Sequence, residues 1–169
     1  MTATLHAQPY DITANGFYFE SFDDYQAKAQ AALNDFGDPV EEFEIQFIDG
    51  ETIDAQLFLA WGVHQGDIAA YLDAVEDWDD HDKTKAIIAL REGLAAFNPA
   101  QDHRQDLDVD LYYVDTMEEL AEQFLDEGLF GDIPTPLQYY IDTAAIARDL
   151  AMDYTMIYIC NDRLAYRAD

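Results

Sequence analysis

The sequence predicts an α+β protein of three small domains in an elongated arrangement: α+β over residues 1–60, helical over 61–103, and α+β again over 104–169. Two observations support this prediction. Strand-like alternation and helical spacing both occur in the first and last segments, whereas the middle segment shows helical spacing only. Each segment is short enough that its own core would be marginal, so mutual packing or dimerisation is expected.

In the first segment, the aromatic run Gly16–Phe19 predicts a short strand. Ser21 occupies an N-cap position, and the apolar spacing after it predicts a helix that stops at residues 37–39, Gly-Asp-Pro. Apolar and polar residues alternate over 42–47, which predicts a half-buried strand with one acidic face. The pair Asp49-Gly50 then predicts a turn.

The middle segment contains two predicted helices. Residues 57–61 are apolar but fit no element clearly. Helical spacing then runs over 66–78 and again from Asp79 to a stop at Asn98-Pro99. Because the connection is so short, the two helices are expected to form an antiparallel hairpin. The buried side of the second helix is predicted to carry Ile87, Leu90, Leu94 and Phe97.

The last segment begins with a predicted strand over 106–114, with aspartates on one face. Thr116 and Glu119 have the spacing of a capping box, so a helix should follow and stop at Gly128. The remaining pattern predicts helical turns over 137–140 and 144–152, followed by a hairpin whose strands, 154–160 and 164–167, meet at Asn161-Asp162.

The composition of the chain argues against direct nucleic-acid binding and against disorder. Its 169 residues include 36 Asp and Glu against 8 Lys and Arg, a net charge of −28. Residues 1–82 hold 19 acids and one base, and residues 83–169 hold 17 acids and 7 bases. Such a charge repels nucleic acid, so direct nucleic-acid binding is not expected. Half of the residues are hydrophobic and 14% are aromatic, which argues against a disordered acidic chain.

Signals for catalysis, secretion and membrane insertion are missing from the sequence. No nucleophile elbow, phosphate loop or dinucleotide fingerprint occurs, so neither an enzyme nor a cofactor is predicted. The single cysteine, Cys160, follows an apolar run and is expected to be a core thiol. There is no secretory signal and no apolar run of about 18 residues, so we expect a soluble cytoplasmic protein.

Two acidic clusters resemble metal sites only in part. Asp106-x-Asp108-x-Asp110 has the first spacings of a calcium loop, but Leu111 stands where such a loop needs Gly and Met117 where it needs Glu. We therefore interpret these aspartates as the solvent face of a strand. The run 77–82, which contains four acids and a histidine, is interpreted as a helix connection whose acids cap the second helix, rather than as a metal or acid–base site.

Acids recur on the polar side of most predicted elements. Duplex DNA carries one charge per about 1.7 Å, so 28 charges correspond to roughly 14 base pairs, or about 50 Å. A distributed acidic surface of this kind could imitate DNA toward a basic protein. Its predicted members are Glu20, Asp23, Asp24, Glu41, Glu42, Glu44, Asp73, Glu76, Asp77, Asp106, Asp108, Asp110, Glu118, Glu119, Glu122, Asp126 and Glu127.

A more specific signal lies in residues 128–150. An ordered series of residues there resembles the ArdA antirestriction proteins: Gly131, Pro134, Leu137, Gln138, Tyr140, Ile141, Asp142, Arg148, Asp149 and Leu150. The chain departs from that family's usual pattern at Thr143, where Tyr is usual, and at Ala147, where Gly is usual. The family's N-terminal opening is also shortened here, over residues 10–16.

The resemblance implies three small domains in a curved rod, a homodimer joined near the C-terminal domain, and inhibition of type I restriction–modification enzymes by occupation of their DNA-binding cleft. It implies no catalysis and no cofactor. The motif residues are then expected to fix the fold and the dimer, while the surface acids bind the enzyme. Two other hypotheses remain open: an acid-adapted protein without a DNA-mimic role, and a cation-binding module.

Overall fold

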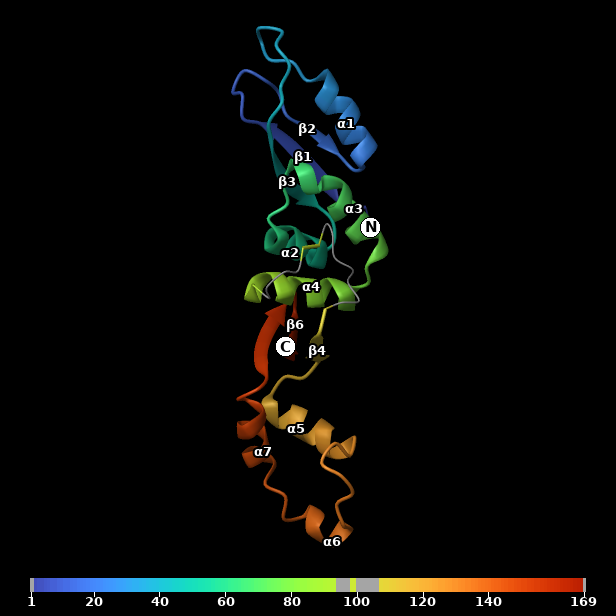
Figure 1. The fold of residues 1–169 in the computed structure, drawn as a ribbon, viewed down its shortest axis with the longest axis vertical. Coiled ribbons are helices and arrows are strands. Elements are labelled where there is room, and N and C mark those ends of the chain that lie inside the picture. Colours follow the sequence, from blue (N-terminus) through green and yellow to red (C-terminus); the bar gives the residue numbers. More distant parts are fainter. Residues whose placement is uncertain (1, 94–97, 100–106, 169) are drawn as a thin grey trace. The chain divides into compact units, whose positions relative to one another are not determined.

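The structure is a computed structural model that describes residues 2–93, 98–99 and 107–168 (Figure 1). It divides into two compact units, Met1–Leu107 (unit 1) and Asp108–Asp169 (unit 2). Each unit combines helices with one three-stranded antiparallel sheet, which confirms the α+β class. The three domain boundaries and the elongated arrangement stay predictions. No described helix has the length and apolar character needed to cross a bilayer.

The sheet of unit 1 has the strand order β2-β1-β3. The strands β2 (Phe17–Phe19) and β3 (Phe43–Asp49) confirm the sequence prediction, whereas the central strand β1 (Thr4–Pro9) was not predicted. Leu5 and Ala7 of β1 are fully buried, and β3 buries Phe43 and Ile45 on alternate positions. The residues that alternate with these buried ones point to the other face of the sheet, where Glu44 is exposed.

Helix α1 (Phe22–Ala31) covers the aromatic face of this sheet. Ser21 caps it as predicted, because its hydroxyl accepts a hydrogen bond from Asp24 N at 3.2 Å. Tyr25 packs with its ring centroid 5.0 Å from that of Phe19. The predicted end of this helix at residues 37–39 is wrong: the helix ends at Ala31. The Asn34 side chain accepts from the Phe36 and Asp38 N–H groups and folds the following residues into a loop instead.

The rest of unit 1 is helical. The segment that fitted no element is part of α2 (Thr52–Trp61), and the next helices are the short η1 (Gln65–Asp67), α3 (Ile68–Asp77) and α4 (Asp80–Glu92). The predicted hairpin is wrong, because α4 packs chiefly against α2. Helix α4 also ends earlier than predicted, at Gly93 with φ 62°. The predicted core residues Leu94 and Phe97 lie outside the described residues.

A buried ion pair joins the helices of unit 1. Lys83 of α4 donates to Asp54 Oδ1 of α2 at 2.7 Å, and only 5% and 1% of the two side chains are exposed. The same ammonium donates to the Val75 carbonyl of α3, and the Tyr71 hydroxyl donates to the Asp54 carbonyl at 2.9 Å. Burial, and then the charge of Asp54, raise the pKa of Tyr71 far above its usual range, so that hydroxyl remains a donor.

Unit 2 packs two helices on its sheet, whose strand order is β4-β6-β5. The elements are β4 (Val109–Tyr112), α5 (Met117–Asp126), α6 (Thr135–Gln138), α7 (Thr143–Leu150), β5 (Thr155–Ile159) and β6 (Asp162–Ala168). Leu120 and Phe124 of α5 meet Tyr154 and Ala165 in the core. Thr116 caps α5 as predicted, but Glu119 reaches back to Asp115 N rather than to Thr116 N.

Strand predictions in unit 2 need two corrections. The first strand starts at Val109 rather than at Asp106, which lies outside the described residues. Ile159 pairs with Asp162, so the hairpin turn is Cys160-Asn161, one residue earlier than predicted. Cys160 therefore lies half-buried in the turn, with φ 55°, and the prediction of a core thiol in a strand is wrong.

Replacing one partner of the buried ion pair tests how much the pair contributes to the stability of the fold. Lys83→Met leaves the Asp54 carboxylate buried without its counter-charge, so the free energy of unfolding should fall by about 3–5 kcal/mol in urea denaturation. The matched control is Lys85→Met, a half-buried lysine two residues away, which should change stability by less than about 1 kcal/mol. Equal effects of the two substitutions would contradict the assignment. The double change Asp54→Asn, Lys83→Met should recover part of the loss.

Candidate acidic interface

The predicted acidic residues lie where a partner could reach them. Asp106 is outside the described residues; every other predicted member is exposed except Asp24 and Asp110, which are half-buried. Each of those two lies beside a cation: Lys28 is 2.7 Å from Asp24, and Arg167 is 2.6 Å from Asp110. Among all described Asp and Glu residues, only Asp54 is buried. Most of the described acids are therefore exposed to water.

The few cations of the chain are used largely inside their own units. Lys83 is buried against Asp54, and Lys28 bonds both Asp24 and the Tyr18 carbonyl. Arg167 bonds Asp110 and lies over the Tyr154 ring. Arg163 lies over the Tyr158 ring at 5.4 Å. These contacts leave few positive groups to offset the field of the exposed acids.

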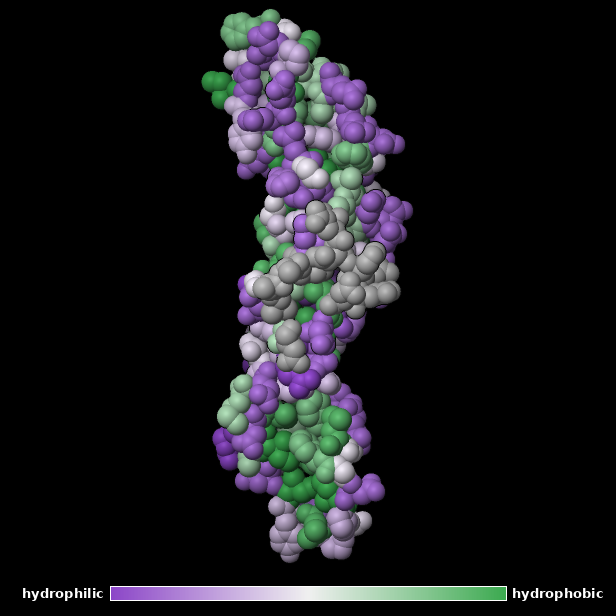
Figure 2. Space-filling model, in the orientation of Figure 1, coloured by the Kyte–Doolittle hydropathy of each residue, from purple (hydrophilic) through white to green (hydrophobic). Residues whose placement is uncertain are grey.

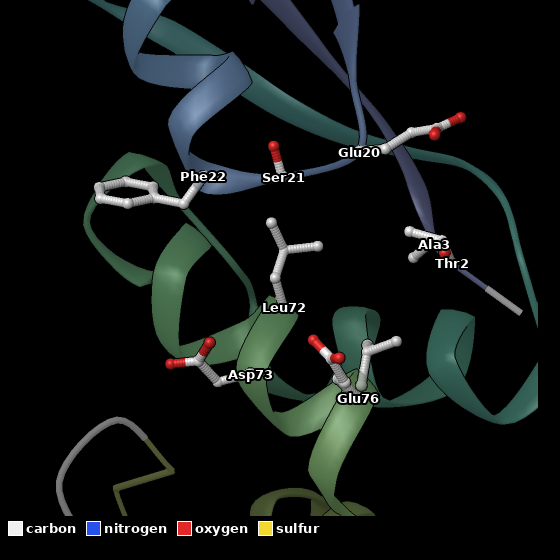
Figure 3. Close-up of a pocket in the computed structure, with 9 residues that line it drawn as sticks. Thr2, Ala3, Glu20, Ser21, Phe22, Leu72, Asp73 and Glu76 are labelled. Carbon is white, nitrogen blue, oxygen red and sulfur yellow. The ribbon is translucent and has the colours of Figure 1, made fainter.

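Three of the predicted acids line one hollow of unit 1. Glu20, Asp73 and Glu76 surround a space of about 410 Å³ whose apolar wall includes Phe22 and Leu72. Figure 3 shows Asp73 and Glu76 on the α3 side and Glu20 across from them, beyond the end of β2, with Leu72 pointing between the two sides. Carboxylates above an apolar floor suit the charged head and aliphatic stem of an Arg or Lys side chain.

Part of the acidic surface opposes helix stability. Helix α3 has Glu76 and Asp77 in its last turn with no base, and α5 ends with Asp126 and Glu127 in the same way. A carboxylate at a helix C-terminus meets the negative end of the helix dipole, which is unfavourable. By contrast, acids in the first turns, such as Asp23 of α1, are stabilising. Helix stability therefore explains only some of the acids.

The two metal-like clusters have structural roles in the described chain. Asp79 caps α4 by accepting from Asp82 N at 2.8 Å, which confirms the capping interpretation of residues 77–82. Asp110 bonds Arg167, and Asp108 is exposed before β4. Among the residues that the structure describes, no group of three or more His, Cys, Asp or Glu is arranged to hold a metal ion.

The motif residues of unit 2 divide into three groups. Some build the fold: Asp142 caps α7 by accepting from Ala145 N at 3.0 Å, and Leu150 packs against the core. Ala147 is 3% exposed within α7. Others line a hollow of about 430 Å³ below α5, among them Gly131, Gln138 and Ile141. Arg148, Asp149 and Pro134 are exposed.

Several large apolar side chains are exposed on the segment that includes part of this hollow. Within residues 129–140, Tyr139 and Tyr140 are 88% and 83% exposed, and Leu129, Phe130 and Leu137 are 51–60% exposed. Figure 2 shows hydrophobic residues gathered on one face of unit 2. We call these five residues the apolar patch of unit 2. Side chains of this size are seldom exposed together without a partner.

A family model described as antirestriction protein (ArdA) matches residues 65–162. The match covers more than half of the chain and includes the whole motif. The chain belongs to the ArdA antirestriction family. This confirms the resemblance read from residues 128–150. No curated protein sequence matches the chain significantly.

The sequence carries little signal for the contacts that organise unit 1. The pair Asp54–Lys83 carries a weak signal, because Asp54 is an isolated acid between Ile53 and Leu57 of an apolar run. Strand β1 was missed because its buried residues include small side chains such as Ala7. The exposure of Leu137 and Tyr140 also could not be read from a motif that equally suits a core.

Neutralising acids at opposite helix ends should change stability in opposite directions. Glu76→Gln and Asp126→Asn remove charges from C-terminal turns and should each raise the free energy of unfolding by about 0.3–1 kcal/mol. Asp23→Asn, the matched control in a first turn, should lower it by a similar amount. Urea denaturation at low ionic strength measures all three, and the differences should shrink in 0.5 M salt. A loss of stability in Glu76→Gln would contradict the argument.

Proposed function

We propose that this member of the ArdA family is a DNA mimic: it occupies the DNA-binding cleft of a type I restriction–modification enzyme through its acidic surface. The observation that carries the proposal is the outward placement of the acids, including those that cost helix stability at the ends of α3 and α5. The protein acts by binding, in the cytoplasm where its target works, with no catalysis and no cofactor.

Charge density supports the mimicry. A cleft that binds duplex DNA presents basic groups spaced to meet one phosphate per about 1.7 Å. If the predicted domains are arranged as a rod, the net charge of −28 spreads over a length comparable to about 14 base pairs. The hollow between Glu20, Asp73 and Glu76 supplies a place where a basic side chain of the cleft could insert.

The alternative hypotheses receive less support. Acid adaptation to high salt explains exposed acids but not the membership in an antirestriction family. A cation-binding module would need a cluster of ligands, and the described residues contain none. The DNA-mimic proposal accounts for both the family and the charge.

Competition with DNA tests the function directly. The protein is titrated against duplex DNA bound to the methyltransferase core of a type I enzyme at about 100 mM salt, where charges still interact over roughly 10 Å. We expect displacement of the DNA near stoichiometric protein, and displacement that weakens as the salt concentration rises. Polyglutamate at equal total charge is the control and should displace far less, because its carboxylates have no fixed arrangement.

The distributed nature of the surface predicts how variants behave in this assay. Glu20→Gln alone removes a small share of the field and should weaken competition less than about threefold, whereas Glu20→Gln, Asp73→Asn and Glu76→Gln together should weaken it about tenfold or more. No displacement by the wild-type protein at large excess would refute the proposed function. Abolition by a single neutralisation would refute the distributed surface.

We further propose that the protein is a homodimer joined through the apolar patch of unit 2. Leu137 and Tyr140 belong both to the family motif and to this patch, and their side chains are 55% and 83% exposed. Motif residues that neither fill the core nor cap a helix are suited to an interface. A dimer would double the length of acidic surface offered to the cleft.

Sedimentation velocity tests the dimer. Wild-type protein should sediment as a dimer, and the double variant Leu137→Ser, Tyr140→Ser as a monomer, because truncated apolar anchors lose most of the energy of an interface. Leu59→Ser, which changes a 76% exposed leucine of α2, is the matched control and should stay dimeric. A wild-type monomer at micromolar concentration would exclude the proposal.

A further inference from the structure

A second group of exposed apolar side chains lies in unit 1, on two loops far apart in the sequence. One loop joins β1 to β2 and the other follows α1, and they lie side by side at one end of the sheet (Figure 1). Ala14 and Asn34 form a backbone bridge, and Asn34 Nδ2 donates to Asp11 Oδ2 at 3.0 Å. The two loops therefore form one structure.

Both loops are internally ordered. Asp11 Oδ1 accepts from the N–H and the hydroxyl of Thr13, at 2.9 and 2.7 Å. The Asn34 side chain holds the other loop through the N–H groups of Phe36 and Asp38, and Gly37 provides the positive φ of 85° that the turn needs. Hydrogen bonds from Asn34 and then Thr13 hold the pKa of Asp11 below its usual value. The backbone that carries the side chains of these loops is therefore preorganised.

These loops present four large apolar side chains to solvent. Ile12 is 96% exposed, Phe36 80%, Tyr10 66% and Leu33 56%. We call these four residues the apolar tip. Figure 2 shows hydrophobic residues projecting among hydrophilic ones at this end of unit 1. Local folding does not account for them, because the loops are held by Asp11, Asn34 and Gly37 rather than by these side chains.

We propose that the apolar tip is a specificity contact: it docks into an apolar depression, bordered by basic side chains, on the same restriction enzyme whose DNA cleft receives the acidic surface. This inference rests on the proposed function and assigns it a non-electrostatic anchor. Acids alone would bind basic surfaces with little discrimination, whereas an apolar anchor of fixed shape distinguishes one protein from another.

Charge selects the kind of partner. The tip is interleaved with Asp11, Asp35 and Asp38, and neither loop, over residues 10–16 and 32–39, contains Lys or Arg. Anionic membranes and nucleic acids are repelled by such a rim. A protein surface with basic residues around an apolar recess complements both parts of the tip.

Area argues against a second copy of the chain as the occupant. Four side chains offer at most a few hundred Å², while a stable interface buries about 800 Å² on each partner. Two identical tips would also bring their acidic rims together. The tip therefore suits an accessory contact within a larger interface, which the acidic surface provides.

The tip also lies outside the family match, which begins at residue 65. A contact that selects among restriction enzymes is expected to lie in such a part of the chain.

The DNA-competition assay tests the tip when it is run as a salt series. The double variant Ile12→Ser, Phe36→Ser should raise the protein concentration needed to displace DNA by about tenfold or more. The slope of log affinity against log salt should stay as in the wild-type protein, because no charge is removed. Leu59→Ser is the matched control and should compete as the wild-type protein does. A urea denaturation curve like that of the wild-type protein shows that the double variant is folded. If the double variant does not fold, the single variant Ile12→Ser is used in its place.

Each outcome distinguishes the two proposals. A double variant that competes as well as the wild-type protein overturns the tip while leaving the DNA-mimic function intact. A wild-type protein that displaces no DNA overturns the function and with it the tip. Sedimentation velocity of both proteins covers the remaining case: loss of self-association in the Ile12→Ser, Phe36→Ser variant would show that the tip binds a second copy, contrary to the proposal.

Discussion

Repulsion among surplus carboxylates is the constraint to which the rest of this structure is adapted. A net charge of −28 on 169 residues opposes compaction, and the chain has only 8 bases to offset it. The fold meets this by sending the acids outward and by building its contacts from apolar and aromatic side chains. In unit 1 the ring centroids of Tyr25 and Phe19 are 5.0 Å apart, and in unit 2 those of Phe124 and Tyr112 are also 5.0 Å apart. Neither cluster depends on charge, so both can persist inside a strongly negative surface.

Among the described residues, one buried contact departs from this pattern. Asp54 and Lys83 are buried together, although a buried ion pair is seldom more stable than an apolar one of the same volume. Its geometry suggests a different benefit. The ammonium also reaches the Val75 carbonyl, and Tyr71 donates to the Asp54 carbonyl, so α2, α3 and α4 are fixed to one another by directional bonds. Apolar packing alone fixes the register of packed helices less strictly. The register of α3 matters because it positions Asp73 and Glu76, which line the hollow with Glu20.

Local rules predicted much of this fold, and long-range contacts account for the rest. Ser21 and Thr116 were predicted as caps, and Asp79 belongs to the acidic run predicted to cap α4, because capping depends on residues only a few positions away. The end of α1 was missed because Asn34, a single polar side chain, terminates the helix by binding its own loop and Asp11. The partner of α4 was missed because a short connection suggests a hairpin, whereas Lys83 pairs with Asp54, 29 residues earlier. For the candidate site, the acid list followed from composition, but the grouping of Glu20 with Asp73 and Glu76 required the tertiary structure.

Placement of charge against local stability separates a functional acidic surface from a merely soluble one. Acids that serve folding collect at helix N-termini, and Asp23, Asp79 and Glu118 are of this kind. Glu76 and Asp126 lie at the opposite ends, where the helix dipole disfavours them and the last turn itself carries no basic residue. A sequence under pressure only for solubility could place these charges on loops at no cost. Their retention at unfavourable positions is what a partner with fixed basic groups would require, because such a partner fixes where the negative charge must lie.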